Sequence, residues 1–419
     1  MDAKEVLKKQ IEIVKPTLKT IDKINNVAKE FILDLNKKIN KKKINAEIFI
    51  GGSIAKNTLV KKDKYDVDIF VRFNKKYKDK EISLLLGKII GKNAKRVHGS
   101  RDYFQLIKKD IIIEVIPVIK IKKPTEARNV TDLSYFHVKF VINKIENNKQ
   151  LADEIILAKA FCHAQDCYGA ESYINGFSGY ALELLICHYG SFINFIKDIA
   201  NSNDGEKIII DDSKFYKRKE DVLVEVNEAK IQNSIILIDP TYKERNALAS
   251  LSNQTFNKFK YACRDFLKNP MSSFFEKKNI KDELKKYKDL IIISLKTNKQ
   301  KGDIAGTKSK KFFNFLLYNL RKEFVIKIAK FDYDDKKNIA YFYLVVLKKD
   351  NETIRGPPIT NIKGLTDFKK AHSSAYIKDH IAYATLKHDM SFDEFFRRFI
   401  QKDKKIIKDM SIKEIKLVK

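Results

Sequence analysis

Two aspartates that follow a glycine-rich turn are the first residues whose types and spacing could do chemistry. The segment GGSIAKNT starts at Gly51, and Asp66 and Asp68 come after it, separated by one residue. Side chains alternate between the two faces of a strand, so both carboxylates would point to one face and could hold divalent cations. Two such ions, about 3.5 to 4 Å apart, can activate an attacking hydroxyl and stabilise a leaving pyrophosphate. The pattern therefore predicts metal-assisted phosphoryl transfer.

A third carboxylate lies in a later apolar segment, residues 111–119. Glu114 is its single charged residue, and an unpaired charge among apolar side chains is costly. A metal ion would explain this position, and Mg²⁺ suits such oxygen ligands. In the turn, Gly52 permits a close approach of the backbone, and Ser53 could bond a phosphate oxygen where the next helix begins.

Each of these features also has an ordinary structural explanation. A Gly-Gly-Ser sequence is usually only a turn, and Asp-x-Asp on a strand is usually a solvated edge. A lone Glu in a strand often pairs with a lysine at the rim. The combination, in this order and at these distances, is much rarer, and it favours a catalytic site.

The elements around these motifs indicate a first region that mixes helices with strands. Apolar residues recur at helical spacing over residues 24–35, which predicts an amphipathic helix. Strands are expected at residues 46–50, 65–73 and 111–119. From about Ala152 the pattern becomes helical, including a run over residues 180–199, and predicts an all-helical module.

The last third reads as a separate α+β unit. A lysine-rich, poorly patterned stretch follows Pro270, and then residues 310–323 have the pattern of a helix. Two strands are expected around residues 334–337, as a hairpin. The aromatic runs at 312–318 and 341–346 could stack RNA bases, but their spacing fits core packing better.

Composition limits the class of protein. The 419 residues carry 84 Lys and Arg against 54 Asp and Glu, a formal charge of +30 that favours a polyanion as partner. The longest apolar run, residues 339–347, is far below the roughly 20 residues that cross a membrane, and charges at Lys4 and Glu5 argue against a signal peptide. Four cysteines without zinc-ligand spacing predict no structural zinc. A protein of the cytoplasm, not bound to a membrane, is expected.

The motifs GGSIAKNT, DVDIF and IEVIP together resemble the catalytic head of the DNA polymerase beta nucleotidyltransferase superfamily. Further segments narrow the resemblance to the archaeal, class I CCA-adding enzymes. These segments are SYFHVKF, YGAES, GFSGYALELL, HYGSF and IDPTYKERNALASLS, with RGPPI and AHSSAYIKD in the last third. The resemblance covers most of the chain, and its C-terminal matches are weaker.

The resemblance implies roles for particular residues of this chain. It assigns the metal-binding, catalytic triad to Asp66, Asp68 and Glu114. It implies that Arg245 reads the edge of the base and that Asp239 orients it. The residues that it places around the nucleotide are, in chain order, Gly52, Ser53, Lys56, His137, Lys159, Tyr168, Asp239 and Arg245.

Some of these residues have ordinary alternatives, and some positions depart from the family. Outside the resemblance, His137 would be a core histidine, Tyr168 a packing aromatic and Lys159 a solvated residue. The remaining histidines have no partner pattern and are expected to be structural. The family more often has Asp at Glu114 and Arg at three other positions, which are Lys56, Leu133 and Lys139 in this chain. Lysine can still neutralise phosphate, although as a point charge instead of a bidentate fork.

The resulting expectation is a multidomain α+β protein. Its parts are a polymerase-beta-like nucleotidyltransferase head at residues 1–145, a helical neck with base recognition at 146–275, and an α+β body and tail that bind tRNA at 276–419. The resemblance implies transfer of CMP, CMP and AMP from CTP and ATP to a tRNA 3′ end, with Mg²⁺ and without a template. The alternatives are a poly(A) polymerase or oligoadenylate synthetase, or an inactive tRNA-binding protein. A homodimer is compatible with the sequence.

Overall fold

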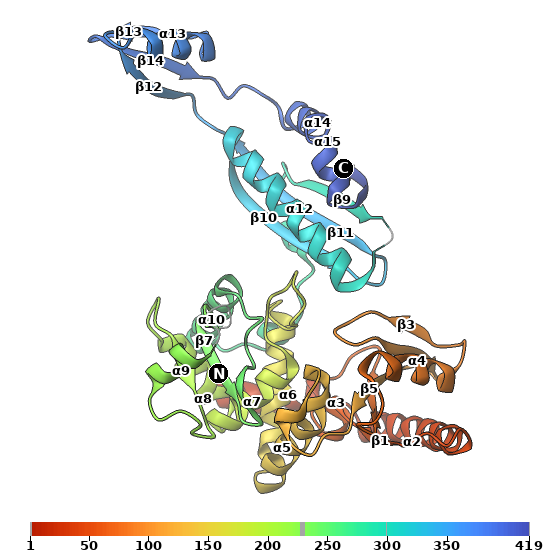
Figure 1. Cartoon of the computed structure of the whole chain (residues 1–419). Helices are drawn as coiled ribbons and strands as arrows, with labels where there is room; N and C mark the ends of the chain where they lie inside the picture. Colours follow the sequence, from red (N-terminus) through yellow and green to blue (C-terminus); the bar gives the residue numbers. More distant parts are fainter. Residues whose placement is uncertain (1, 227–230, 299, 419) are drawn as a thin grey trace. The chain divides into compact units, whose positions relative to one another are not determined.

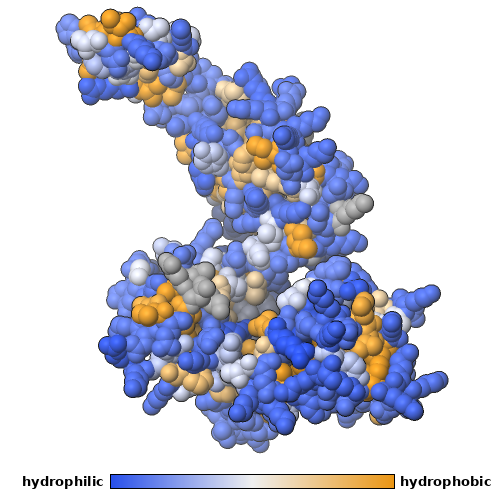
Figure 2. Space-filling view, viewed as in Figure 1, coloured by the Kyte–Doolittle hydropathy of each residue, from blue (hydrophilic) through white to orange (hydrophobic). Residues whose placement is uncertain are grey.

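The computed structural model describes residues 2–226, 231–298 and 300–418. The chain forms two compact units, Met1–Lys277 and Lys278–Lys419 (Figure 1). Among the described residues, every helix is too short or too polar to span a lipid bilayer. Hydrophilic residues cover most of the visible face of both units (Figure 2), as the composition indicates.

The first unit begins with two helices, α1 (Ala3–Val14) and α2 (Leu18–Lys41). The Thr17 side chain caps α2 by accepting a hydrogen bond from the backbone N–H of Thr20 (3.3 Å). The predicted apolar stripe of α2 is buried, because residues three and four positions apart share one face of a helix. This confirms the amphipathic helix expected there.

A five-stranded sheet follows, in the order β1-β2-β5-β4-β3. The strands β2 and β5 are parallel neighbours, and the other neighbouring pairs are antiparallel. The helices α2 and α4 (Asp79–Ile90) pack on the face that Val67, Ile69 and Val71 present. The strands are β1 (Ala46–Ile50), β2 (Asp66–Phe73), β3 (Lys95–Val97), β4 (Tyr103–Lys108) and β5 (Ile111–Ile119). The three strands expected from the sequence are confirmed.

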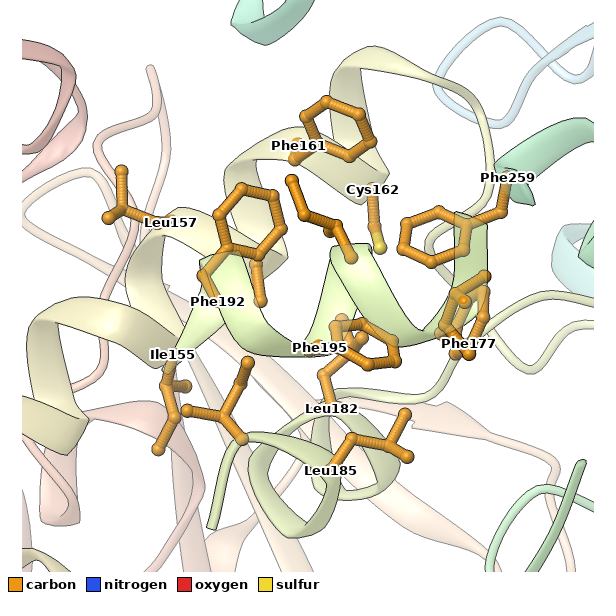
Figure 3. Close-up of a cluster of buried hydrophobic side chains, with 14 of the residues drawn as sticks. Ile155, Leu157, Phe161, Cys162, Phe177, Leu182, Leu185, Phe192, Phe195 and Phe259 are labelled. Carbon is orange, nitrogen blue, oxygen red and sulfur yellow. The ribbon is translucent and has the colours of Figure 1, made fainter. Parts of the chain in front are cut away.

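A helical layer built around aromatic side chains makes up much of the rest of the first unit. Phe161, Phe177, Phe192, Phe195 and Phe259 meet in one buried cluster (Figure 3). The helices are α5 (Ser134–Asn147), α6 (Gln150–Ala164), α7 (Gly179–Tyr189), α8 (Phe192–Asn201) and α10 (Asn253–Lys268). The run expected over residues 180–199 is two helices, since Gly190 adopts φ 73° and Ser191 caps α8.

The prediction of an all-helical middle module is wrong, because a three-stranded sheet lies within it. The sheet has the order β6-β7-β8, with β6 (Ile208–Ile210), β7 (Ile235–Asp239) and β8 (Tyr242–Asn246). All five residues of β7 are buried, and a short apolar run of this kind fits a buried strand as well as a helix. The first unit also contains the short helices α3 (Gly52–Ala55) and α9 (Lys219–Glu225), and the 3₁₀ turns Pro124–Glu126, Val130–Leu133 and Ser272–Phe275.

The second unit contains a four-stranded antiparallel sheet in the order β10-β11-β9-β15. The predicted hairpin around residues 334–337 joins β10 to β11, and the predicted helix is longer, since α12 starts at Gly302. Phe312, Phe313 and Phe342 are buried in its core, which confirms core packing of the aromatic runs. The elements are α11 (Ile280–Leu284), β9 (Ile291–Thr297), α12 (Gly302–Glu323), β10 (Phe324–Asp334), β11 (Ile339–Lys348), α14 (Phe392–Lys402), α15 (Lys404–Asp409) and β15 (Ile412–Val418).

A smaller sheet completes the second unit (Figure 1). Its strands have the order β12-β14-β13. They are β12 (Glu352–Pro358), β13 (Tyr376–Lys378) and β14 (Ile381–Leu386), with α13 (Ile362–Ala371) in the connection from β12 to β13. Among them, Ala382 and Ala384 are the apolar residues that are fully buried.

Candidate active site

The three predicted metal carboxylates lie on neighbouring parallel strands. Asp66 and Asp68 lie on β2 and Glu114 lies on β5, and the register of the strands pairs Asp68 with Glu114. Val67 and Ile69 alternate with the aspartates and are fully buried. The alternation therefore puts both aspartates on the sheet face opposite the core, as the sequence indicates.

Burial and like charges both act on these carboxylates. Burial, followed by the charges of Glu114 and Asp66, raises the pKa of Asp68 to about 7. Burial also raises the pKa of Glu114, and a hydrogen bond from Gln105 Nε2 to Glu114 Oε1 (2.6 Å) partly offsets this. Each carboxylate makes the ionised form of its neighbour less stable, and a bound cation would relieve this repulsion.

The side chains are not gathered around one point in this structure. Within the described ranges, no three His, Cys, Asp or Glu side chains form a group that could hold a metal ion. Asp66 instead forms an ion pair with Lys62, and Gln105 binds Glu114. The donor set still fits a hard divalent cation, because it offers three carboxylates on one pair of strands. The metal assignment stays a prediction.

The glycine turn packs directly on the carboxylate strand. Gly52 has φ +60°, and a Cβ there would lie 1.9 Å from Asp68 Oδ2. The Gly51 N–H also donates to the carbonyl oxygen of Asp68 (2.8 Å). Only glycine avoids both the backbone strain and the clash. Ser53 follows in α3, so the structure brings the turn and the aspartates together.

Two of the predicted nucleotide residues meet in a buried ion cluster. Lys56 Nζ lies 2.6 Å from Glu183 Oε2, and Lys159 Nζ lies 2.8 Å from Glu183 Oε1. Lys159 also donates to the Thr58 hydroxyl (2.9 Å). Burial lowers the pKa of Lys159, and the charge of Glu183 opposes this. Burial alone would raise the pKa of Glu183, but the two lysines hold it below its usual range.

Sequence reasoning did not single out Glu183. The available signal was the one used for Glu114, a lone acid in an apolar segment, here GFSGYALELL. The side chain is on α7 and is almost completely buried. Buried charges of this kind are normally paired, and the two lysines are the pair.

The residues predicted for base recognition form a second cluster. Arg245 Nη1 donates to Asp239 Oδ2 (2.5 Å), and His137 Nε2 lies 3.0 Å from the same oxygen. Asp239 Oδ1 accepts from the hydroxyls of Thr241 (2.7 Å) and Tyr180 (3.1 Å). The Tyr180 ring stacks on His137 at 4.1 Å between centroids. Tyr180 is a further residue of the cluster that the sequence did not single out.

The charges of this cluster are set by burial and by Asp239. Burial lowers the pKa of His137, although the contact with Asp239 opposes the effect. Burial alone would raise the pKa of Asp239, but the contact with His137 and the charge of Arg245 hold it well below its usual range. The carboxylate therefore stays ionised and fixes Arg245.

Tyr168 lies next to the lysine cluster. Its hydroxyl is 2.8 Å from the position of a Cβ on Gly179, and Lys159 Cε is 3.9 Å from the same position. The Tyr168 ring stacks on His163 at 3.8 Å between centroids. Burial raises the pKa of Tyr168. The predicted nucleotide residues of α6 and the following loop are thus neighbours.

A cavity of about 500 Å³ adjoins Arg245. Its lining includes Leu133, Ala170, Ser178, Tyr242 and Arg245. Leu133 is one of the positions at which the sequence is expected to depart from the family, and its apolar side chain lines this cavity. A second departure, Lys139, has its Nζ 4.8 Å from the centre of the Tyr135 ring.

Comparison with known proteins decides the family. A nucleotidyltransferase domain family matches residues 29–151, and the family of the second domain of tRNA nucleotidyltransferase matches residues 153–276. The CCA-adding enzyme of Nanoarchaeum equitans is 33% identical over 342 residues, which cover 80% of this chain and 81% of that protein. The chain belongs to the archaeal CCA-adding enzyme family. The CCA-adding enzyme of Methanocaldococcus jannaschii is 30% identical, over 92% of this chain and 88% of the relative.

Membership of the CCA-adding enzyme family confirms the resemblance read from the motifs. It makes the chain a nucleotidyltransferase, and the domain family implies use of a divalent metal. A solved structure of the Cid1 poly(U) polymerase, with Mg and 3′-dATP bound, shares the fold with a TM-score of 0.52. It is 12% identical and covers 65% of this chain and 98% of that one. The α+β fold class is confirmed.

Proposed function

We propose that this protein adds CMP, CMP and AMP in turn to the 3′ end of tRNA, from CTP and ATP and without a nucleic-acid template. The supporting observation is that one compact unit holds three carboxylates on two neighbouring strands, a cationic cluster and an arginine fixed by Asp239. Lys56 ends α3, which starts at Gly52 of the turn that packs on Asp68, so the cationic cluster adjoins the strand that carries the aspartates. A nucleoside triphosphate needs these three kinds of group in this order.

The carboxylates Asp66, Asp68 and Glu114 would hold Mg²⁺. When bound, the metal supplies charge neutralisation for the attacking 3′ oxygen and the leaving pyrophosphate. Gly52 keeps the turn against Asp68, and Ser53 at the start of α3 would bond a phosphate oxygen. In this way the protein would orient the α-phosphate toward the acceptor.

The two lysines would bind the phosphates, and the arginine would read the base. Lys56 and Lys159 present ammonium groups that match phosphate charge. Arg245 lines the cavity and is fixed by Asp239, which suits a donor aimed at base edges. His137, which contacts Asp239, and Tyr168, which lies beside Lys159 and Gly179, would complete the nucleotide site.

The tRNA would be held mainly by the last third of the chain. We assign residues 1–145 to the catalytic head, 146–275 to the neck and 276–419 to the body and tail. Exposed lysines of the second unit suit an RNA that is recognised by its backbone and shape. The site of action would be the cytoplasm, where tRNA and nucleotides are available.

The test is incorporation of labelled CMP into a tRNA transcript that lacks the CCA end. The purified protein should label this transcript with Mg²⁺ and CTP, and should not label a transcript that already carries CCA. Chelation of the metal should stop the reaction. A protein that binds the transcript but incorporates no nucleotide would support the inactive alternative, and open-ended addition of AMP would support a poly(A) polymerase.

A further inference from the structure

One buried carboxylate contacts both lysines of the proposed phosphate site. Glu183 is 1% exposed, Lys159 4% and Lys56 8%, so the three charges are shielded from water. The two ammonium groups bind different oxygens of Glu183, at 2.6 and 2.8 Å. Such charge-assisted contacts are short and directional. The positions of both ammonium groups are therefore set by one side chain.

The contact joins segments that are far apart in the sequence. Lys56 ends α3, next to the glycine turn, whereas Lys159 lies on α6 and Glu183 on α7. Thr58 adds to the connection, because its hydroxyl accepts from Lys159 and its carbonyl oxygen lies 3.4 Å from the same ammonium group. Glu183 thus connects the turn that follows β1 with the helices of the middle region.

The cluster of Lys56, Lys159 and Glu183 carries a net positive charge. Two lysines and one glutamate sum to +1, in a setting where an uncompensated charge is expensive. An anion that approaches Lys56 and Lys159 would complete the pairing. Lys56 ends the short helix α3, which starts at Gly52 of the turn that packs on Asp68. A nucleotide bound at the carboxylates would therefore have its phosphates close to this cluster.

We propose that Glu183 is a positioning residue for nucleotide binding, which holds the ammonium groups of Lys56 and Lys159 at a fixed spacing for the phosphates of CTP and ATP. The inference rests on the proposed function, since it takes a nucleoside triphosphate as the ligand. Groups that are ordered before binding lose less conformational entropy when the ligand arrives. Glu183 would thus act on binding through the lysines, without touching the nucleotide.

The test is the Glu183→Gln variant of the full chain, in CMP addition to a tRNA that lacks CCA. The amide keeps the shape but cannot neutralise two cations, so the lysines should move apart. The KM for CTP should rise about tenfold, while the KM for tRNA and kcat change less than about threefold, because only ground-state binding of the phosphates is weakened. Pyrophosphate should inhibit the variant correspondingly less well.

A matched control separates positioning from simple loss of stability. Glu154 is a partly buried glutamate on α6 whose carboxylate accepts from the backbone N–H of Phe192 (2.6 Å), and it has no contact with the lysines among the described residues. Glu154→Gln should lower Tm without changing the KM for CTP. If Glu183→Gln lowers Tm in the same way and leaves the KM for CTP unchanged, Glu183 is only structural and the proposal is wrong.

A second variant tests the same proposal if Glu183→Gln does not fold. Glu183→Asp retains the charge but is shorter by one methylene, and it cannot reach both lysines at their present distances. Its KM for CTP should also rise, and a normal KM would overturn the proposal. A wild-type protein that incorporates no nucleotide would instead refute the proposed function, so the two failures are distinguishable.

Discussion

At the scale of single residues, the catalytic assignment depends most on Asp68. It lies opposite Glu114 in the strand register, and its charge is disfavoured by burial and by its neighbours. A group held in such a place for stability alone would be unusual, because an uncharged side chain would fit better. A catalytic role therefore explains the position of Asp68 better than a contribution to stability does.

Asp68→Asn should therefore remove activity without loss of stability. The amide has nearly the same shape but cannot bind a divalent cation as a carboxylate does, and CMP addition should fall by at least about 100-fold. Tm should stay equal or rise, because a disfavoured charge is removed. Asp34→Asn, an exposed change on α2 where the carboxylate pairs only with Lys38 among the described residues, should alter neither property. An active Asp68→Asn variant would disprove the triad.

Arg245 should control the choice of base. Arg245→Lys keeps the positive charge beside Asp239 but loses the planar fork of donors. Discrimination of CTP against UTP should fall by about 1 to 3 kcal/mol, which is roughly 5- to 150-fold in the ratio of kcat/KM. Single-nucleotide incorporation with each triphosphate measures this ratio. An unchanged ratio would show that Arg245 does not read the base.

His137 should make stability sensitive to acid. Burial lowers the pKa of His137 in the fold below its ordinary value of about 6.5, so the unfolded chain binds the proton more readily. The stability that neutral His137 contributes is fully present above the unfolded pKa and is lost as the pH falls below about 6.5. Asp239, Arg245, Lys56 and Tyr180 are the charged or titratable groups that face it.

The measurement is Tm between pH 7.5 and 5.5 for the wild type and for His137→Gln. The variant should lose less Tm over this interval, because it has no imidazole to protonate. Equal slopes would mean that His137 is not held neutral by the fold. Activity need not be measured, so the result is independent of the catalytic assignment.

At the scale of elements, the glycine turn is the part whose geometry is most restrictive. The turn joins β1 to α3 and packs against β2, where a Cβ at Gly52 would overlap the Asp68 carboxylate. The alternation of side chains on β2 was enough to predict the face of the aspartates. The tight contact of the turn with Asp68 could not be predicted, because it depends on how the strands are stacked.

Gly52→Ala should cost activity out of proportion to stability. Gly205 is a matched control, since it also has positive φ (83°) but a Cβ there would meet no atom within 4 Å. Both alanine variants should lose about 1 kcal/mol from backbone strain, and only Gly52→Ala should displace Asp68 and abolish CMP addition. Similar activities of the two variants would contradict a catalytic role for this turn.

The strands and some side-chain contacts of the middle region could not be predicted from the sequence. The strand β7 is a short run of apolar residues, and β6, which pairs with it, precedes it by more than twenty residues. Periodicity cannot separate such a run from a buried helix. The contacts of Glu183 with Lys56 and of Tyr180 with Asp239 were also not predictable, because each joins segments that are distant in the sequence. By contrast, the shared face of Asp66 and Asp68 was predictable, because the two residues are separated by one position on a single strand.

At the scale of the whole molecule, the two compact units separate the proposed chemistry from most of the proposed RNA binding. Every residue assigned to metal, phosphate or base lies between Gly52 and Arg245, in the first unit. The second unit carries exposed lysines on α13, α14 and α15, namely Lys369, Lys370, Lys402, Lys404 and Lys405. Lys308 and Lys310 are less available, because they contact Ser411 and the Phe331 ring.

Charge reversal of the five exposed lysines to Glu should weaken tRNA binding in the full chain. Each phosphate contact that is lost should lower the slope of log affinity against log salt by about 0.7 to 0.9. The KM for CTP should stay the same, because the nucleotide site lies in the other unit. Unchanged tRNA affinity and salt slope would show that these lysines are only a solvated surface.

The central claim is tested most directly by the length and sequence of the product. A tRNA transcript that lacks CCA should gain two nucleotides with CTP alone, none with ATP alone, and three, ending in A, with both triphosphates. Single-nucleotide electrophoresis and sequencing of the 3′ end would give this result. A ladder of added A residues with ATP alone, or no addition with both triphosphates, would contradict the account.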